Sequence, residues 1–110
     1  MPLAEAIDAE LLQGPQHLAA RDHATAFRHF ERAHILSQRR NWDHLRSHAW
    51  MWRAGWQRRD AREIIGQIPR MLAALLFSRL WVPAGNTGGA RVSAFRRMPV
   101  PQDLQLILQG

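Results

Sequence analysis

The stretch Asp22–Gln38, DHATAFRHFERAHILSQ, decides the fold of this chain. Its apolar residues Ala26, Phe30 and Ala33 recur at intervals of three and four, which places them on one face of an α-helix. The first residue is an aspartate, a type that often caps helix N-termini. Two arginines follow the stretch, where positive charge complements the negative end of a helix dipole. The pattern therefore predicts an amphipathic helix over this stretch.

Similar periodicity predicts further helices before and after it. The pair Gly14-Pro15 interrupts the first of them, so we expect a helix over 3–13 and a short or resumed helical stretch over 16–20. Pro69 lacks the backbone N–H that a helix interior uses, which predicts a kink or a new start at that point. The other expected helices cover residues 42–58, residues 60–74 and the closing DLQLILQ.

Two of these segments resemble each other. RDHATAFRHFERAHIL from Arg21 aligns with RDAREIIGQIPRMLAA from Arg59, so that Phe30 corresponds to Ile68. The first block is similar to the second helix of a tetratricopeptide repeat, but a stable solenoid normally needs at least three such units. The sequence therefore predicts an all-α fold, a small bundle of two tetratricopeptide-like helical hairpins over residues 1–82. A Gly- and Pro-containing tail over 83–110 is expected to pack on it within the same domain.

Composition narrows the possible functions. The 110 residues suffice for one domain, and 46% of them are hydrophobic. The absence of cysteine excludes disulfides and thiolate metal sites. The formal net charge of +6 favours anionic partners, and an acidic protein is the expected one. Nucleic acid is a minor alternative. All basic residues are arginine, and such a uniform choice can reflect the codon bias of a genome as easily as selection for phosphate binding. The start shows no secretory signal, and no apolar run is long enough to span a bilayer, which predicts a cytoplasmic protein.

Four polar residues predict a site between two neighbouring helices. Glu31 and His34 are three residues apart, and His44 and His48 are four apart, so each pair shares one helix face. A short connection makes the two helices antiparallel, which brings both pairs to the same level. Imidazole and carboxylate suit a transition-metal ion such as Zn, Cu or Ni, and Met51 would add sulfur for Cu(I). The predicted metal ligands are Glu31, His34, His44 and His48.

Other interpretations of the same residues stay open. The cluster can equally be a buried polar network that fixes the packing of the helices, with Gln38 among its hydrogen-bond partners. A protein-interaction module is a second possibility, in which an outer face with Arg46, Arg53 and an exposed Trp50 engages an acidic protein while the cluster is structural. An enzyme using His34 and Glu31 as acid and base comes third, because neither a nucleophile nor a substrate pocket can be argued.

The tail contains PAGNTGGARVSAF followed by MPVP. The glycine-rich part lacks the lysine and the spacing of a P-loop, so it predicts a tight turn rather than a phosphate site. The extended segment after it is expected to lay apolar side chains across the bundle: Val92, Phe95, Met98 and Val100.

Four motifs together resemble one known family. They are ERAHILSQ from Glu31, the H-x-x-x-H-x-x-M that starts at His44, the RD-x-x-E-x-x-GQ that starts at Arg59, and the tail motif GNTGGA. In this order they resemble a bacterial family of short proteins known only as a domain of unknown function (DUF3703). The resemblance brings no activity, but it implies that the polar cluster and the tail turn both belong to the family pattern. It strengthens the prediction of a metal site.

Overall fold

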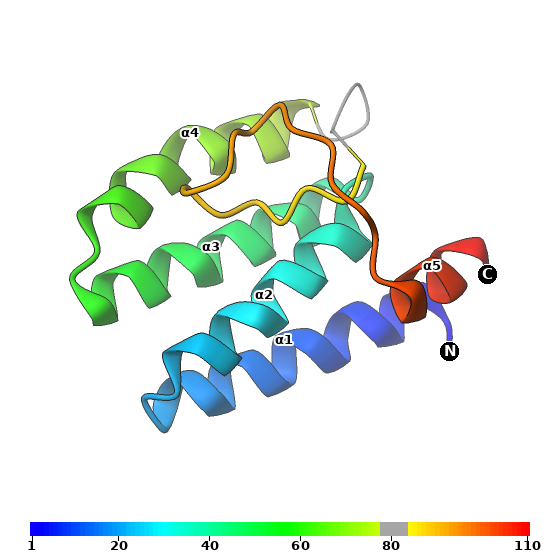
Figure 1. Cartoon of the computed structure of the whole chain (residues 1–110), viewed down its shortest axis with the longest axis horizontal. Helices are drawn as coiled ribbons and strands as arrows, with labels where there is room; N and C mark the ends of the chain where they lie inside the picture. The colour runs from blue at the N-terminus through cyan, green and yellow to red at the C-terminus, as the bar shows by residue number, and fades with distance from the viewer. Residues whose placement is uncertain (78–83) are drawn as a thin grey trace.

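The computed structural model describes residues 1–77 and 84–110, and these form five helices and no strand. Helix pairs α1·α2 and α3·α4 pack as two antiparallel hairpins, and α2 packs against α3 to join them (Figure 1). A short fifth helix packs on α1 and α2. The predicted all-α architecture of two helical hairpins with a tail packed on them is confirmed. The helices are α1 (Leu3–Ala19), α2 (His23–Ser37), α3 (Asn41–Arg58), α4 (Ala61–Phe77) and α5 (Gln102–Gln109).

Both hairpins turn on the same dipeptide, Arg followed by Asp. Arg21 and Arg59 adopt left-handed backbone conformations with φ of 61° and 54°, which terminate α1 and α3. The aspartate that follows each of them then caps the next helix. Asp22 Oδ1 accepts a hydrogen bond from the Thr25 N–H, and Asp60 Oδ1 accepts one from the Glu63 N–H, each at 3.4 Å. The repeat seen in the sequence is therefore real at the turns.

The first helix differs from the prediction, because α1 continues through Gly14-Pro15 to Ala19. The glycine is needed for packing and does not break the helix. A Cβ atom at Gly14 would lie 2.3 Å from Cε1 of Phe30, whose ring is fully buried between the helices. The interruption in the apolar pattern is the point at which the Phe30 ring of α2 packs against the backbone of α1.

The second block of the repeat also differs, since Ile68 is 48% exposed whereas the aligned Phe30 is completely buried. Helix α4 is continuous through Pro69 and turns a polar edge inward, with Glu63 and Gln67 buried. The reason is that α4 packs on α3 on one side and faces the backbone of the tail on another. That backbone offers hydrogen-bonding groups, which polar side chains satisfy.

The tail segment 84–92, which we call the strap, runs between α2 and α4 (Figure 1). Further along, Val100 packs against the core as predicted and Leu104 of α5 is fully buried. Phe95, expected to lie across the bundle, is instead 74% exposed, so that prediction is wrong. The expected boundary at residues 82 and 83 lies outside the described residues. Among the described helices, none is long and apolar enough to cross a membrane.

Candidate metal centre

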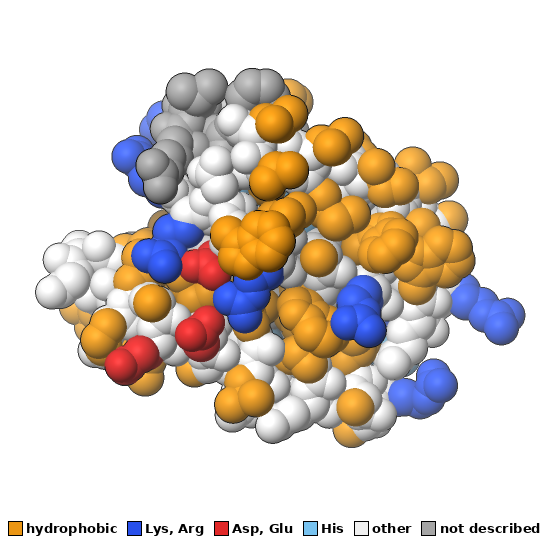
Figure 2. All heavy atoms as spheres, turned by 180° about the vertical axis from the view of Figure 1, so that it is seen from behind, with side chains coloured by type: hydrophobic (Ala, Val, Ile, Leu, Met, Phe, Trp, Pro, Cys, Tyr) orange, Lys and Arg blue, Asp and Glu red, His pale blue; other side chains and the backbone are white. Residues whose placement is uncertain are grey.

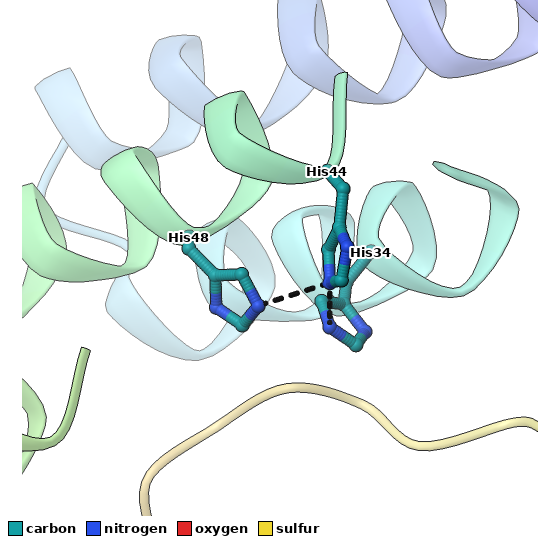
Figure 3. Close-up of side chains that lie close together, drawn as sticks. All are labelled: His34, His44 and His48. Carbon is teal, nitrogen blue, oxygen red and sulfur yellow. Dashed lines mark hydrogen bonds between the residues drawn. The ribbon is translucent and has the colours of Figure 1, made fainter. Parts of the chain in front are cut away.

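Three of the four predicted ligands meet at one point between α2 and α3 (Figure 3). His34 comes from the last turn of α2, and His44 and His48 come from the first two turns of α3. Their ring centroids form an almost equilateral triangle with sides of 4.6, 4.6 and 4.8 Å. All three side chains are buried, with at most 5% of each residue exposed. The short α2–α3 connection therefore brings His34 to the same level as His44 and His48, as predicted.

Two of the rings have a fixed orientation and a fixed tautomer. His34 Nδ1 lies 2.7 Å from the carbonyl oxygen of Asn86, and His48 Nδ1 lies 2.6 Å from Oε1 of Gln67. Both partners accept hydrogen bonds, so each Nδ1 must carry the hydrogen and donate it. In a neutral ring this leaves Nε2 with a free lone pair. The lone pairs of His34 and His48 consequently point toward the third ring.

The third ring, His44, lies between these two acceptors. Its Nε2 is 2.9 Å from Nε2 of His34 and 3.1 Å from Nε2 of His48, the two contacts dashed in Figure 3. One Nε2 can carry only one hydrogen and so makes one good hydrogen bond, not two. If His44 Nε2 carries the hydrogen, it can donate to the lone pair of His34 or to that of His48, but not well to both. One lone pair is then left without a donor among these three nitrogens. A cation at their centre would satisfy all three.

Burial keeps the triad in the form that binds metals. Loss of solvation lowers the pKa of His44 to about 4 and that of His48 to about 3, where the neighbouring His44 also contributes. The pKa of His34 is lowered well below its usual value, again chiefly by burial. At neutral pH the three rings are therefore uncharged imidazoles, the state in which histidine coordinates metal ions.

A polar network behind the rings holds them in place. Gln67, which is fully buried, accepts from His48 and donates through Nε2 to the Gly88 carbonyl and to Glu63 Oε2, each at 2.9 Å. The other oxygen of Glu63 accepts the N–H of Ala90 at 3.0 Å. The strap is thus bonded both to the rings and to α4. Outer partners of this kind orient the imidazoles in metal sites.

The remaining predicted members of the cluster lie around the triad. The ligand atoms within 4.8 Å of one another, among the described residues, belong to the three histidines and not to Glu31. Burial raises the pKa of Glu31, with Thr87 and Glu63 close to its carboxyl group. Gln38 donates to the same Asn86 carbonyl that His34 uses, at 3.3 Å, which is the supporting role expected of it. Met51 is fully buried, and its sulfur accepts from Gln67 at 3.4 Å.

The predicted outer face of α3 needs correction. Trp50, expected to be exposed, packs against the core and stacks on Phe30 with ring centroids 5.7 Å apart. Trp56, by contrast, is 56% exposed. Arg46 forms ion pairs with Asp43 and Asp8. Because α3 contacts three other helices, its inner surface is wider than a single stripe and includes Trp50.

Sequence reasoning missed the network that supports the rings. In the sequence Glu63 and Gln67 stand out only as part of the RD-x-x-E-x-x-GQ motif, which by itself predicts no role for them. A signal was present, since two polar residues four apart in an otherwise apolar helix share one face and indicate a buried polar edge. The role of the Asn86 carbonyl could not be found in this way, because a backbone acceptor leaves no trace in residue type.

The fold and the site together define a class, that of small all-helical proteins with a buried histidine triad closed by a C-terminal strap. The family described as "Protein of unknown function (DUF3703)" matches residues 1–108. The chain therefore belongs to this family, and the match includes the first twenty residues, which the sequence motifs did not cover. Comparison with curated proteins and with solved structures finds no match.

Proposed function

We propose that this is a cytoplasmic transition-metal-binding protein, in which Nε2 of His34, His44 and His48 coordinate one ion. The observation that carries the proposal is the triangle of Nε2 atoms, in which the acceptor nitrogens of His34 and His48 both face the same nitrogen of His44. Two rings are fixed as acceptors by partners behind them, and the third can donate to only one of the two. A polar network built for stability alone would place a donor opposite each acceptor.

The spacing of the nitrogens supports this proposal. In a tetrahedral zinc site with Zn–N bonds near 2.0–2.1 Å, ligand nitrogens lie about 3.3 Å apart. The two contacts at His44 measure 2.9 and 3.1 Å, so both need to lengthen by only a few tenths of an ångström. Three protein ligands also leave a fourth position for water or another small ligand.

Two carboxylates near the triad would favour a divalent ion, against the positive charge of Arg70. Three neutral imidazoles do not offset a double positive charge, and an uncompensated charge in a buried site is costly. Glu63 is connected to the triad through Gln67, and Glu31 lies one helical turn from His34. We propose that these two carboxylates balance the ion, with Glu31 either as an outer counter-charge or as a fourth ligand. Zn²⁺ fits this arrangement best, followed by Cu and Ni.

Metal titration of purified, untagged apoprotein tests the proposal. Zn²⁺, Cu²⁺ and Ni²⁺ are titrated against a chromophoric chelator, and bound metal is counted by plasma mass spectrometry. We expect one ion per chain with an affinity tighter than micromolar. Changing His44 or His48 to alanine should remove the uptake. The matched control is His23→Ala, because His23 is a half-buried histidine that bonds to Gln57 outside the triad.

The outcomes separate a metal site from a structural network. Loss of uptake in both triad variants and retention in the His23 variant supports the proposal. Absence of uptake in the unchanged protein, with a large loss of folding stability in His44→Ala, makes the cluster structural. Uptake that survives His44→Ala assigns the metal to other residues. In the last two cases the proposal is wrong.

An acidic protein partner is the second candidate, and the arginine excess is what favours it. Two residues of the predicted interaction face are less available than expected. Trp50 packs against the core, and Arg46 already pairs with carboxylates. Arg53 lies over the Trp50 ring at 4.8 Å and is exposed. Charge reversal at Arg53 tests this candidate, since an acidic partner captured by the unchanged protein should then be lost.

A further inference from the structure

The outer face of α4 is apolar and uncovered. Every exposed residue of this helix between Ile65 and Leu76 is hydrophobic or proline. The five large side chains are between 45% and 68% exposed, and among the described helices α4 packs against α3 alone. Figure 2 shows hydrophobic side chains gathered over the part of the surface next to the grey segment, where α4 lies. The large residues of this face are Ile65, Ile68, Leu72, Leu75 and Leu76.

The spacing of these residues indicates what covers them. Ile65, Ile68, Leu72 and Leu75 are separated by three, four and three residues, the a and d positions of two successive heptads. A seam of this kind meets the seam of another helix by knobs-into-holes packing. A lipid surface has no such requirement, and interfacial helices carry exposed lysines and arginines on the polar face beside the apolar stripe. Here no charged residue is exposed between Ile65 and Leu76.

We infer that this face is a homodimer interface, in which α4 packs antiparallel against α4 of a second copy. The exposed apolar area is on the order of 500 Å² per chain, close to the largest patches seen on monomers. Two such faces together bury on the order of 1,000 Å², which a specific interface requires. Identical neutral faces also meet without burying any of the net charge.

The charge at the end of the helix selects the antiparallel orientation. Arg62 is the exposed charged residue on the described part of α4. In a parallel pair the two copies of Arg62 would lie side by side. In an antiparallel pair centred on the seam they are about 25 Å apart at 1.5 Å of rise per residue. That exceeds the Debye length of about 8 Å at physiological salt, so the repulsion is screened.

Sedimentation equilibrium from micromolar to submillimolar protein tests the interface, and the test is independent of the metal site. We expect a dimer for the unchanged chain and at least a tenfold weaker dimer for Leu72→Glu. The matched control is Leu12→Glu on α1, where the leucine is 61% exposed compared with 58% for Leu72. Circular dichroism of both variants verifies that the helices are retained.

Cysteine cross-linking tests the orientation, because the chain has no native cysteine. In the antiparallel pair Leu72 lies opposite Ile68 of the second copy, so an equimolar mixture of Ile68→Cys and Leu72→Cys chains should form a disulfide-linked dimer on mild oxidation, whereas Arg62→Cys alone should not. A chain that stays monomeric at all concentrations overturns the inference. So does a dimer that is unaffected by Leu72→Glu. A monomer that sediments with anionic vesicles would assign this face to a membrane surface instead.

Discussion

Acid should unfold the metal-free protein at a pH where most small helical domains are still stable. In the unfolded chain each histidine binds a proton near pH 6.5, whereas in the fold His44 and His48 bind theirs only near pH 4 and pH 3. The unfolded state therefore holds more protons across this window. Stability is complete above about pH 6.5 and is lost as the pH falls toward the folded pKa values.

The size of the effect follows from the separation between the pH and the unfolded pKa. At pH 5 each buried histidine costs about 2 kcal/mol, since one pKa unit corresponds to about 1.4 kcal/mol. His44 and His48 together therefore cost about 4 kcal/mol, a large part of the whole stability of a small domain, and the depressed pKa of His34 acts in the same direction. The raised pKa of Glu31 works in the opposite direction and recovers part of this loss.

Urea denaturation followed by circular dichroism at pH 7.5, 6 and 5 measures this loss. The variant His44→Gln is the internal control, because it removes one of the titrating groups and should lessen the loss of stability at pH 5 by about 2 kcal/mol. Carboxylates that are ion-paired, such as Asp43 and Asp103, lose their stabilising effect only below this window. A stability that is unchanged or higher at pH 5 would refute the reasoning, since the rings would then be protonated in the fold.

Three further predictions concern the network and the packing. Gln67→Leu leaves the His48 Nδ1–H, the Gly88 carbonyl and a Glu63 oxygen without their partner, so it should lower the free energy of unfolding by at least about 2 kcal/mol. It should also weaken metal binding roughly 10- to 100-fold in a chelator competition, and unchanged affinity would contradict the role given to this residue. Gly88→Ala places a Cβ atom 2.5 Å from the His34 ring at a φ of +84°, so it should lower both stability, by more than about 1 kcal/mol, and metal affinity. Gly89→Ala next to it, where the nearest contact is 3.3 Å, is the control and should change affinity little. Gly14→Ala crowds Phe30, so it should lower stability by about 1–3 kcal/mol in thermal denaturation, with metal affinity retained. A large loss of metal affinity would show that the α1–α2 packing also positions the triad.

Much of the fold could be predicted from local pattern. The interval of three and four around Phe30 defined α2, and the Arg-Asp pairs marked both turns, because these features act within a few residues. The continuity of α1 through Pro15 could not be predicted in this way. It depends on the space that the Phe30 ring occupies next to Gly14, which is a contact between two helices.

The same distinction applies to the site. Spacing along α2 and α3 was sufficient to bring His34, His44 and His48 together. It was not sufficient for the orientation of the rings, which depends on the strap and on α4. Trp50 was misplaced for a related reason, because its face of α3 becomes buried only when α2 lies against it.

The central claim is that three Nε2 atoms bind one metal ion while the atoms behind them keep the rings in place. Nitrogen-15 NMR of the histidine rings during a Zn²⁺ titration tests this most directly. We predict that the Nε2 resonances of His34, His44 and His48 shift together and saturate at one equivalent, with Nδ1 of His34 and His48 protonated throughout. Resonances of the triad that stay unchanged, or a shift confined to His17, His23 and His29, would contradict the account.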